Sequence, residues 1–327
     1  MRCGTGILLA IAVLLVAPRA RAQTPTPPST KQVGFLTPAT CPADHPTSMP
    51  FVDGLRALGH VDGKGMVLQC RVSNGSAEHY RQLAADLVGH KVDVIFAVSS
   101  SAVRAARAET SRIPIVALDL ETDPVASGIA ASLARPGGNT TGIFQDLPEL
   151  SAKRLGLLRD ALPRLARVAM LWDDAMDRGP LTAAVDQARA LGLRAQIATV
   201  RSPADFDAAF RAMVRERAGA VVVIQSPMLE VRNKEVLDLA FANRLPVVGV
   251  FPSFARAGAL MTYGPQIEDL FRQSAAFIDK ILRGARPGDV PIERPTRFYL
   301  YINLKTAKAL GLTIPPSLLL RADQVIE

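Results

Sequence analysis

The stretch VDVIFAVSSSAVRAARAETSRIPIVALDLETD, residues 92–123, contains one complete strand–helix–strand unit. Val92 to Val98 is short, apolar and rich in β-branched residues, which predicts a buried strand. Ala102 to Thr110 is rich in Ala and Arg, which predicts a helix. Ile113 to Leu118 predicts a second strand, with proline near its entry, where a missing N–H does little harm. Such a unit indicates a parallel sheet with helices packed on it.

Polar side chains lie where each of these two strands ends. Three hydroxyl groups separate the first strand from the helix: Ser99, Ser100 and Ser101. Three carboxylates close the second strand: Asp119, Glu121 and Asp123. Free N–H groups and the positive end of the helix dipole favour a bound carboxylate or phosphate beside the serines. Alternatively, Ser99 only caps the helix. For the carboxylates, an ammonium partner or a turn cap is favoured over a metal, because nothing fixes a ligand geometry.

Strands and helices alternate along the rest of the chain as well. Further strands are predicted at residues 33–37, 66–72, 140–144, 167–172, 194–200, 220–224, 245–250, 259–263 and 297–303. Further helices are predicted at 47–58, 77–88, 127–133, 149–162, 181–191, 204–217, 231–243, 266–283 and 304–310. The predicted fold class is α/β, and ligands of such sheets bind at the carboxyl ends of the strands.

The second half of the chain repeats the plan of the first. AGAVVVIQSPMLE (218–230), a helix and LPVVGV (245–250) follow the same order of strand, polar loop, helix and proline-entered strand. In this comparison Gln225-Ser226-Pro227 takes the place of the three serines. The repetition indicates two lobes built alike, although ordinary α/β patterning can produce it by coincidence.

The length of 327 residues suggests roughly two domains. We expect the chain to cross between them near residues 141–148, 255–263 and 292–300, and three crossings make a hinge. The predicted first lobe comprises residues 32–144 and 259–291, and the second comprises 145–258 and 292–327. The predicted architecture is therefore two doubly wound parallel-sheet lobes joined by a three-segment hinge.

The N-terminus has the pattern of a secretory signal peptide. Arg2 is followed by an apolar run, Gly6 to Val16, that is too short to span a bilayer, which needs about 20 residues. Ala20-Arg21-Ala22 is an A-x-A cleavage site. Residues 1–22 are therefore predicted to be a signal peptide and 23–31 a Pro/Thr linker, although a retained anchor is the alternative. The mature protein is expected in the periplasm.

Charge and cysteine content narrow the possible partners and redox state. The formal charge is +8, cleavage removes three arginines and leaves +5, and the rest of the chain has no Lys/Arg block. No nucleic-acid partner is therefore expected. Cys41 and Cys70 remain in an oxidising compartment, either as a disulfide or as two free thiols.

The sequence lacks the familiar cofactor, metal and catalytic motifs. It has no G-x-G-x-x-G after a strand, no Walker A, no G-x-S-x-G, no H-E-x-x-H and no Cys/His metal spacing. No cofactor, metal or catalytic residue is expected. Asp173-Asp174 is either a pair for acid–base chemistry or, as we favour, a solvated loop or polar ligand contact.

Three stretches carry a resemblance to a known family: FVDGLRALGHVDGKGMVLQCR (51–71), DPVASGIAASLARPGGNTTG (123–142) and INLKTAKALGLTIPPSLL (302–319). The chain resembles the substrate-binding proteins of ABC transporters, in the group with tryptophan- and other aromatic-amino-acid-binding members. The resemblance covers about Lys31 to Glu327 and implies a type I periplasmic binding protein.

The resemblance implies capture of a small polar or amino-acid-like solute between the lobes and its delivery to an ABC permease in the inner membrane. No bond would be made or broken, and the protein would be a monomer that closes by a hinge motion. The alternatives are a sensory protein that presents its solute to a receptor, and an exported hydrolase.

Site residues follow from the resemblance by position. The three serines at 99–101 are expected to hold a carboxylate, with Asp123 and Asp119 near an ammonium group. The other expected ligand contacts are Thr37, Asp173, Gln225, Phe251 and Tyr263. The loop at 38–46 departs from the usual ligand-reading loop and holds Cys41. Amino-acid specificity is therefore not inherited from the family.

Overall fold

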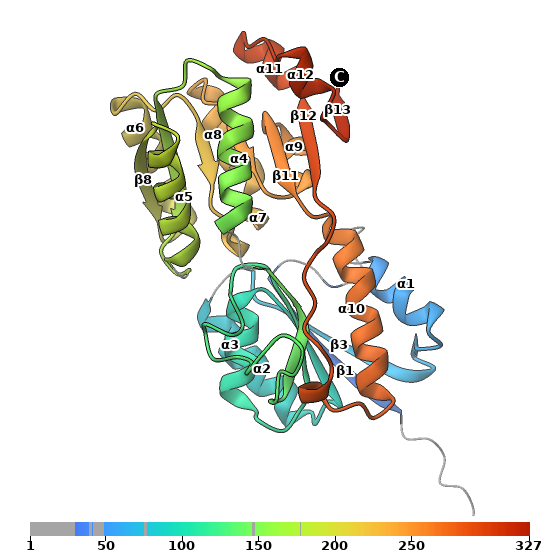
Figure 1. The fold of residues 1–327 in the computed structure, drawn as a ribbon. Coiled ribbons are helices and arrows are strands. Elements are labelled where there is room, and N and C mark those ends of the chain that lie inside the picture. The colour runs from blue at the N-terminus through green and yellow to red at the C-terminus, as the bar shows by residue number, and fades with distance from the viewer. Residues whose placement is uncertain (1–29, 39–40, 42–48, 75–76, 146–147, 177) are drawn as a thin grey trace, which may run out of the picture.

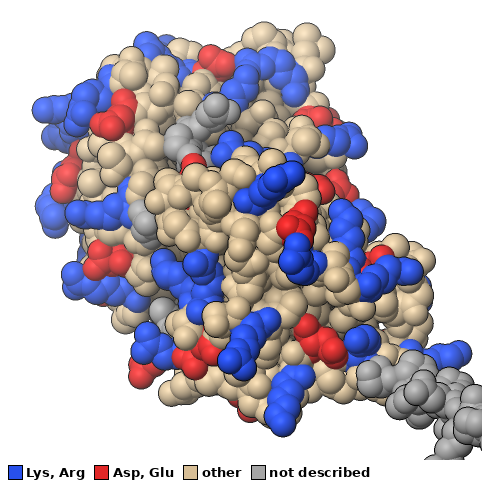
Figure 2. Space-filling model, turned by 60° about the horizontal axis from the view of Figure 1, so that its bottom comes forward, with Lys and Arg blue, Asp and Glu red and all other residues tan. Residues whose placement is uncertain are grey.

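The computed structural model describes residues 30–327 except 39–40, 42–48, 75–76, 146–147 and 177. The predicted signal peptide, and the predicted linker up to residue 29, lie outside the described residues. Within the described part of the chain, no helix combines the length and apolar character needed to cross a membrane. On the face in Figure 2, Lys and Arg are interspersed with Asp and Glu rather than gathered in one basic patch.

The first lobe is built on a parallel sheet of six strands in the order β2-β3-β1-β4-β5-β6. Its strands are β1 (Lys31–Thr37), β2 (Val61–Asp62), β3 (Gly65–Val72), β4 (Val94–Val98), β5 (Ile115–Asp119) and β6 (Thr140–Phe144). One face packs on α1 (Met49–Ala57) and α10 (Ile267–Leu282). The other face packs on α2 (Ala77–Gly89) and α3 (Ser100–Glu109). Helices on both faces make β4, β5 and β6 buried along their whole length, as their apolar sequences require.

The second lobe is built on a sheet of seven strands in the order β13-β12-β11-β10-β9-β7-β8. These are β7 (Arg167–Asp173), β8 (Arg194–Val200), β9 (Val221–Val223), β10 (Val247–Gly249), β11 (Met261–Gly264), β12 (Tyr299–Asn303) and β13 (Gln324–Ile326). The β11–β12 pair is antiparallel, and the other pairs are parallel. The α/β class and the two parallel-sheet lobes predicted from the sequence are confirmed.

Helices also cover both faces of the second sheet. One face packs on α4 (Pro148–Ala161), α5 (Gly179–Ala190), α11 (Leu304–Leu310) and α12 (Pro316–Leu319). The other packs on α6 (Phe206–Arg215), α7 (Pro227–Val231), α8 (Asn233–Ala242) and α9 (Pro252–Ala257). The described residues also include two 3₁₀ turns, η2 (Pro203–Asp205) and η3 (Pro287–Asp289).

Two packing features hold the first sheet together. A cluster of phenylalanine rings fills the face under α1 and α10, and the Phe51 and Phe96 ring centroids lie 4.6 Å apart. On the sheet itself, Gly142 of β6 pairs with Ala117 of β5 at a φ of 130°. A Cβ atom at Gly142 would lie 2.2 Å from the Ala117 carbonyl oxygen, so this position accepts only glycine.

Three segments connect the lobes, which lie one above the other in Figure 1. Strand β6 leads from the first sheet into α4, and β11 leads from the second sheet into α10. The third connection begins after Glu293, which forms a β-bridge with Ile143 of β6. It then leads into β12. Because β6 runs parallel to β5, β11 runs parallel to β10, and each leads into the other lobe, the carboxyl ends of both sheets face each other.

Two sequence expectations about these elements are wrong. The predicted first lobe includes the strand at 259–263, but β11 pairs with β10 and β12 of the second sheet. The crossing therefore comes after Gly264. Residues 127–133 form turns rather than a helix, because Gly128 has a φ of 71° and the Ala130 N–H bonds back to the Pro124 carbonyl.

Candidate functional site

The three serines lie at the start of α3, and Ser99 is the N-cap of that helix. The Ser99 hydroxyl oxygen accepts a hydrogen bond from the Ala102 N–H at 3.3 Å and lies 3.1 Å from the Tyr80 hydroxyl. Burial raises the pKa of Tyr80 to about 12, so this phenol stays protonated. The capping role offered as an alternative for Ser99 is therefore the one that its side chain performs.

The anion position at the start of α3 is taken by a side chain of the protein itself. The Ser100 N–H donates to Oε2 of Glu121 at 2.9 Å, and both residues are buried. The Ser101 hydroxyl accepts from Nη2 of Arg104 at 3.3 Å. The Ser100 hydroxyl is buried and has no hydrogen-bond partner among the described residues. A substrate carboxylate at this point would have to displace Glu121 or approach it closely.

Asp119 and Glu121 form a buried acidic pair beyond the end of β5. Asp119 is 0% exposed, and its Oδ1 accepts the Glu121 N–H at 3.0 Å. Its Oδ2 is unpartnered within the described residues. Burial, and then the Glu121 charge, raise the pKa of Asp119 well above its usual range. Burial also raises the pKa of Glu121, although the Ser100 N–H and the Arg104 charge lower it. The pair therefore favours a state that retains a proton.

Asp123, expected near an ammonium group, caps the turn that follows it. Its Oδ1 accepts the N–H groups of Val125 at 2.8 Å and Ala126 at 3.0 Å. Its carbonyl accepts the Ser127 hydroxyl at 2.6 Å. The turn-capping alternative accounts for Asp123, and Glu121 rather than Asp123 lies beside the serines.

In the second lobe, Asp173 and Asp174 do not form a carboxylate pair for acid–base chemistry. Asp173 is buried at the end of β7, its Oδ1 accepts the Ala175 N–H at 3.0 Å, and burial raises its pKa. Asp174 instead makes an exposed ion pair with Arg201 at 3.0 Å. The separation of their roles disfavours catalysis at this point and leaves Asp173 as a buried polar group at a strand tip.

The internal repeat predicted from the sequence is visible at the start of α7. The Ser226 hydroxyl accepts the Leu229 N–H at 3.1 Å, as the Ser99 hydroxyl accepts the N–H three residues on. Ser226 therefore corresponds to Ser99, and the buried Gln225 lies one residue earlier, at the strand end. The sequence comparison matched the two loops as wholes and did not give this register.

The remaining predicted contacts differ in their surroundings. Phe251 packs in the core of the first lobe with residues of α10, so it joins the lobes rather than forming an open wall. Tyr263 lines a pocket of about 410 Å³ at the hinge, together with Gln145, Leu150, Lys153, Arg294, Pro295 and Phe298. Thr37 is buried at the tip of β1, where its carbonyl accepts the Ser73 N–H at 3.0 Å.

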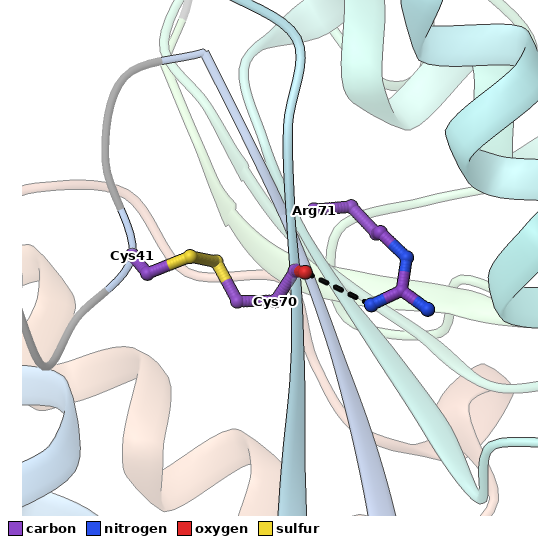
Figure 3. Close-up of a disulfide and its surroundings, with 3 residues drawn as sticks. All are labelled: Cys41, Cys70 and Arg71. Carbon is purple, nitrogen blue, oxygen red and sulfur yellow. Dashed lines mark hydrogen bonds between the residues drawn. A yellow bond between two sulfur atoms is a disulfide. The ribbon is translucent and has the colours of Figure 1, made fainter.

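The two cysteines of the described chain form a disulfide, one of the two alternatives for them. Figure 3 shows Cys41 bonded to Cys70 of β3, with Arg71 donating to the Cys70 carbonyl at 2.9 Å. The Cα atoms lie 5.8 Å apart. The bond ties the loop that follows Thr37 to the neighbouring strand, at the edge of the sheet that faces the second lobe.

Sequence reasoning did not single out Glu121 or Tyr80 for the site. Glu121 was grouped with the carboxylates favoured for an ammonium partner or a turn cap but was not among the expected ligand contacts, and its spacing of two from Asp119 is the signal that places both at one strand tip. Tyr80 was assigned to a helix face, where its helical spacing predicted core packing. Its hydroxyl could be placed beside Ser99 only once α2 and α3 were docked.

Comparison with known proteins gives consistent results. The family model described as ABC transporter substrate binding protein matches residues 32–326. A tyrosine-binding protein from Clostridioides difficile (strain R20291) is 23% identical over 285 residues, which cover 86% of this chain and 81% of that protein.

Two solved structures show the same fold. A conserved domain protein from Vibrio cholerae O1 biovar El Tor strain N16961 has a TM-score of 0.84 at 25% identity, covering 90% of this chain and 99% of that one. The ABC domain from Streptococcus pneumonia in complex with L-Trp has a TM-score of 0.82 at 22% identity, covering 91% and 100%. The chain therefore belongs to the family of ABC transporter substrate-binding proteins, with the two-lobed fold of type I periplasmic binding proteins.

Proposed function

We propose that this protein captures a small amino-acid-like solute between its two lobes and releases it to an ABC permease. The observation that carries the proposal is the set of buried polar groups at strand tips on both facing edges. In the first lobe these include Asp119, Glu121 and Ser100, and in the second they are Asp173 and Gln225. α/β proteins bind their ligands at the carboxyl ends of parallel strands, where these polar groups lie.

The role proposed is binding without catalysis. The Ser99 hydroxyl is paired with the Tyr80 phenol, whose raised pKa keeps it protonated and therefore unable to act as a general base. The Asp173 and Asp174 carboxylates have separate partners. These contacts assemble no nucleophile with a base beside it, which hydrolysis would require.

The family and the N-terminal sequence support a cellular location and a mode of action for this chain. We propose that residues 1–22 direct export and are cleaved, and that the mature monomer acts in the periplasm. There it would close on its solute by a hinge motion about the three connections. Closure requires that the closed state bind the solute more tightly than the open state does.

Thermal unfolding in the presence of candidate solutes tests the proposal. The panel comprises amino acids, amines, aromatic acids, sugars and nucleosides. A solute at a hundredfold excess over its Kd stabilises the folded state by about 2.7 kcal/mol. We expect Gln225→Ala to remove this stabilisation, and Gln82→Ala, at an exposed position on α2, to retain it. Chemical turnover of the solute, or full binding by the Gln225 variant, would contradict the proposal.

A further inference from the structure

We infer that the first lobe recognises a positively charged nitrogen of the solute, and not its carboxylate, through Asp119, Glu121 and Ser100. This inference rests on the proposed function and specifies the chemical class of the solute: an amine or a related cation. It differs from the expectation drawn from the sequence, in which the serines hold an anion. Three observations lead to it.

First, the protein's own carboxylate fills the anion position. The Ser100 N–H at the start of α3 is the donor that an incoming carboxylate would use, and it is bonded to Glu121 at 2.9 Å. A second carboxylate placed there would meet, at close range in a buried site, the negative charge that Glu121 and Asp119 share when the pair retains one proton. Like charges in such surroundings repel strongly, so this end of the site disfavours an anion.

Second, the groups left without partners are acceptors that suit a cation. Oδ2 of Asp119 and the Ser100 hydroxyl are both buried and unpartnered within the described residues, at 0% and 4% exposure. The Ser100 hydroxyl lies close enough to the Glu121 carboxylate to lower its pKa, without completing a hydrogen bond of good geometry. Buried polar atoms of folded proteins nearly always have partners, so these two atoms indicate a missing donor. An ammonium group has three N–H donors and no acceptor.

Third, basic side chains neutralise the pair only in part. Neither Asp119 nor Glu121 is ion-paired with Lys or Arg within the described residues. Arg104 of α3 is the nearest basic influence on Glu121, and its guanidinium donates to the Ser101 hydroxyl at 3.3 Å. Tyr80 of α2 is paired with Ser99.

The test uses matched probes on two carbon skeletons. Tyramine is compared with 3-(4-hydroxyphenyl)propionate, and butylamine with butyrate, by isothermal titration calorimetry on the mature, disulfide-bonded chain. We expect the amine of at least one pair to bind and its carboxylate partner not to bind. Glu121→Gln should weaken amine binding at least tenfold, and the exposed matched variant Glu78→Gln should leave it unchanged.

A second variant keeps the test decisive if Glu121→Gln disturbs the fold. Ser100→Ala removes the hydroxyl beside Glu121 and keeps the Ser100 N–H that bonds to Glu121, and we expect it to weaken amine binding several-fold with little change in thermal stability. The inference is overturned if carboxylates bind and amines do not, if neither class binds, or if both variants bind amines normally. Binding by any solute in the wider panel that depends on Gln225 would still uphold the proposed function. If no solute in that panel binds, the proposed function itself is contradicted.

Discussion

Glu230 provides a sharp test of the electrostatics of the second lobe. It lies in α7, four residues after Ser226, and the Ser253 hydroxyl of α9 donates to its Oε1 at 2.5 Å. Its Oε2 is buried and has no described partner, although part of the side chain is exposed. Burial raises the pKa of Glu230 from 4.5 to about 7, against the lowering effect of Ser253.

The direction of the pH effect follows from this raised pKa. Below pH 4.5, Glu230 is protonated in both the folded and unfolded states, and its contribution to stability is fully present. As the pH rises through about 7, the folded state holds a proton that the unfolded state has already lost, so stability falls. The shift corresponds to about 3 kcal/mol. The loss is complete by about pH 8, one unit above the folded-state value.

Replacement by glutamine removes the titration and keeps an acceptor for Ser253. Urea unfolding at pH 5 and pH 8 measures the effect on the free energy of unfolding. Glu230→Gln should match the wild type within about 1 kcal/mol at pH 5 and exceed it by about 3 kcal/mol at pH 8. Asp119, Glu121 and Asp173 titrate in both proteins, so their contributions cancel. Glu235→Gln, which removes an exposed partner of Arg232, is the control and should change stability by less than about 1 kcal/mol. Parallel pH curves for the wild type and Glu230→Gln would refute the reasoning.

Two further predictions concern the first lobe. Reducing the Cys41–Cys70 disulfide, which closes a span of 29 residues, should destabilise the protein by about 3.5 kcal/mol. The midpoint of thermal unfolding with and without reductant checks this, and a Cys41→Ser/Cys70→Ser variant should show no response to reductant. An unchanged midpoint for the wild type would contradict it. Asp123→Ala should cost about 1 kcal/mol through loss of its turn-capping bonds. It should leave solute affinity within twofold of the wild type. A tenfold loss of affinity, measured by calorimetry, would instead indicate that Asp123 contacts the solute.

Much of the fold could be predicted from the sequence because it depends on local patterns of residues. The apolar runs at 94–98 and 115–119 are buried on both faces, and a strand with helices on either side requires such a run. The serine cap of α3 was likewise visible as a residue type at a helix start. These features depend on residues within a few positions of one another.

Features that depend on distant segments were less accessible. The sheet to which β11 belongs is fixed by its pairing with β12, almost 40 residues later. Phe251 follows a strand of the second lobe yet packs in the core of the first, because α10 returns across the hinge. An apolar pattern shows that such a side chain is buried, but not against which partner.

The candidate site shows the same division most clearly. The sequence by itself determined that three serines and three carboxylates would follow two successive strands of a parallel sheet, because apolar runs and the polar residues directly after them are local properties of the chain. Only the tertiary structure decided which carboxylate reached the Ser100 N–H, 21 residues away, and which one capped its own turn. Hydrogen bonds and charges act over a few ångströms, so their partners are fixed only when the strands and α3 are packed. That choice gave the anion position to Glu121 and left acceptors for a cation.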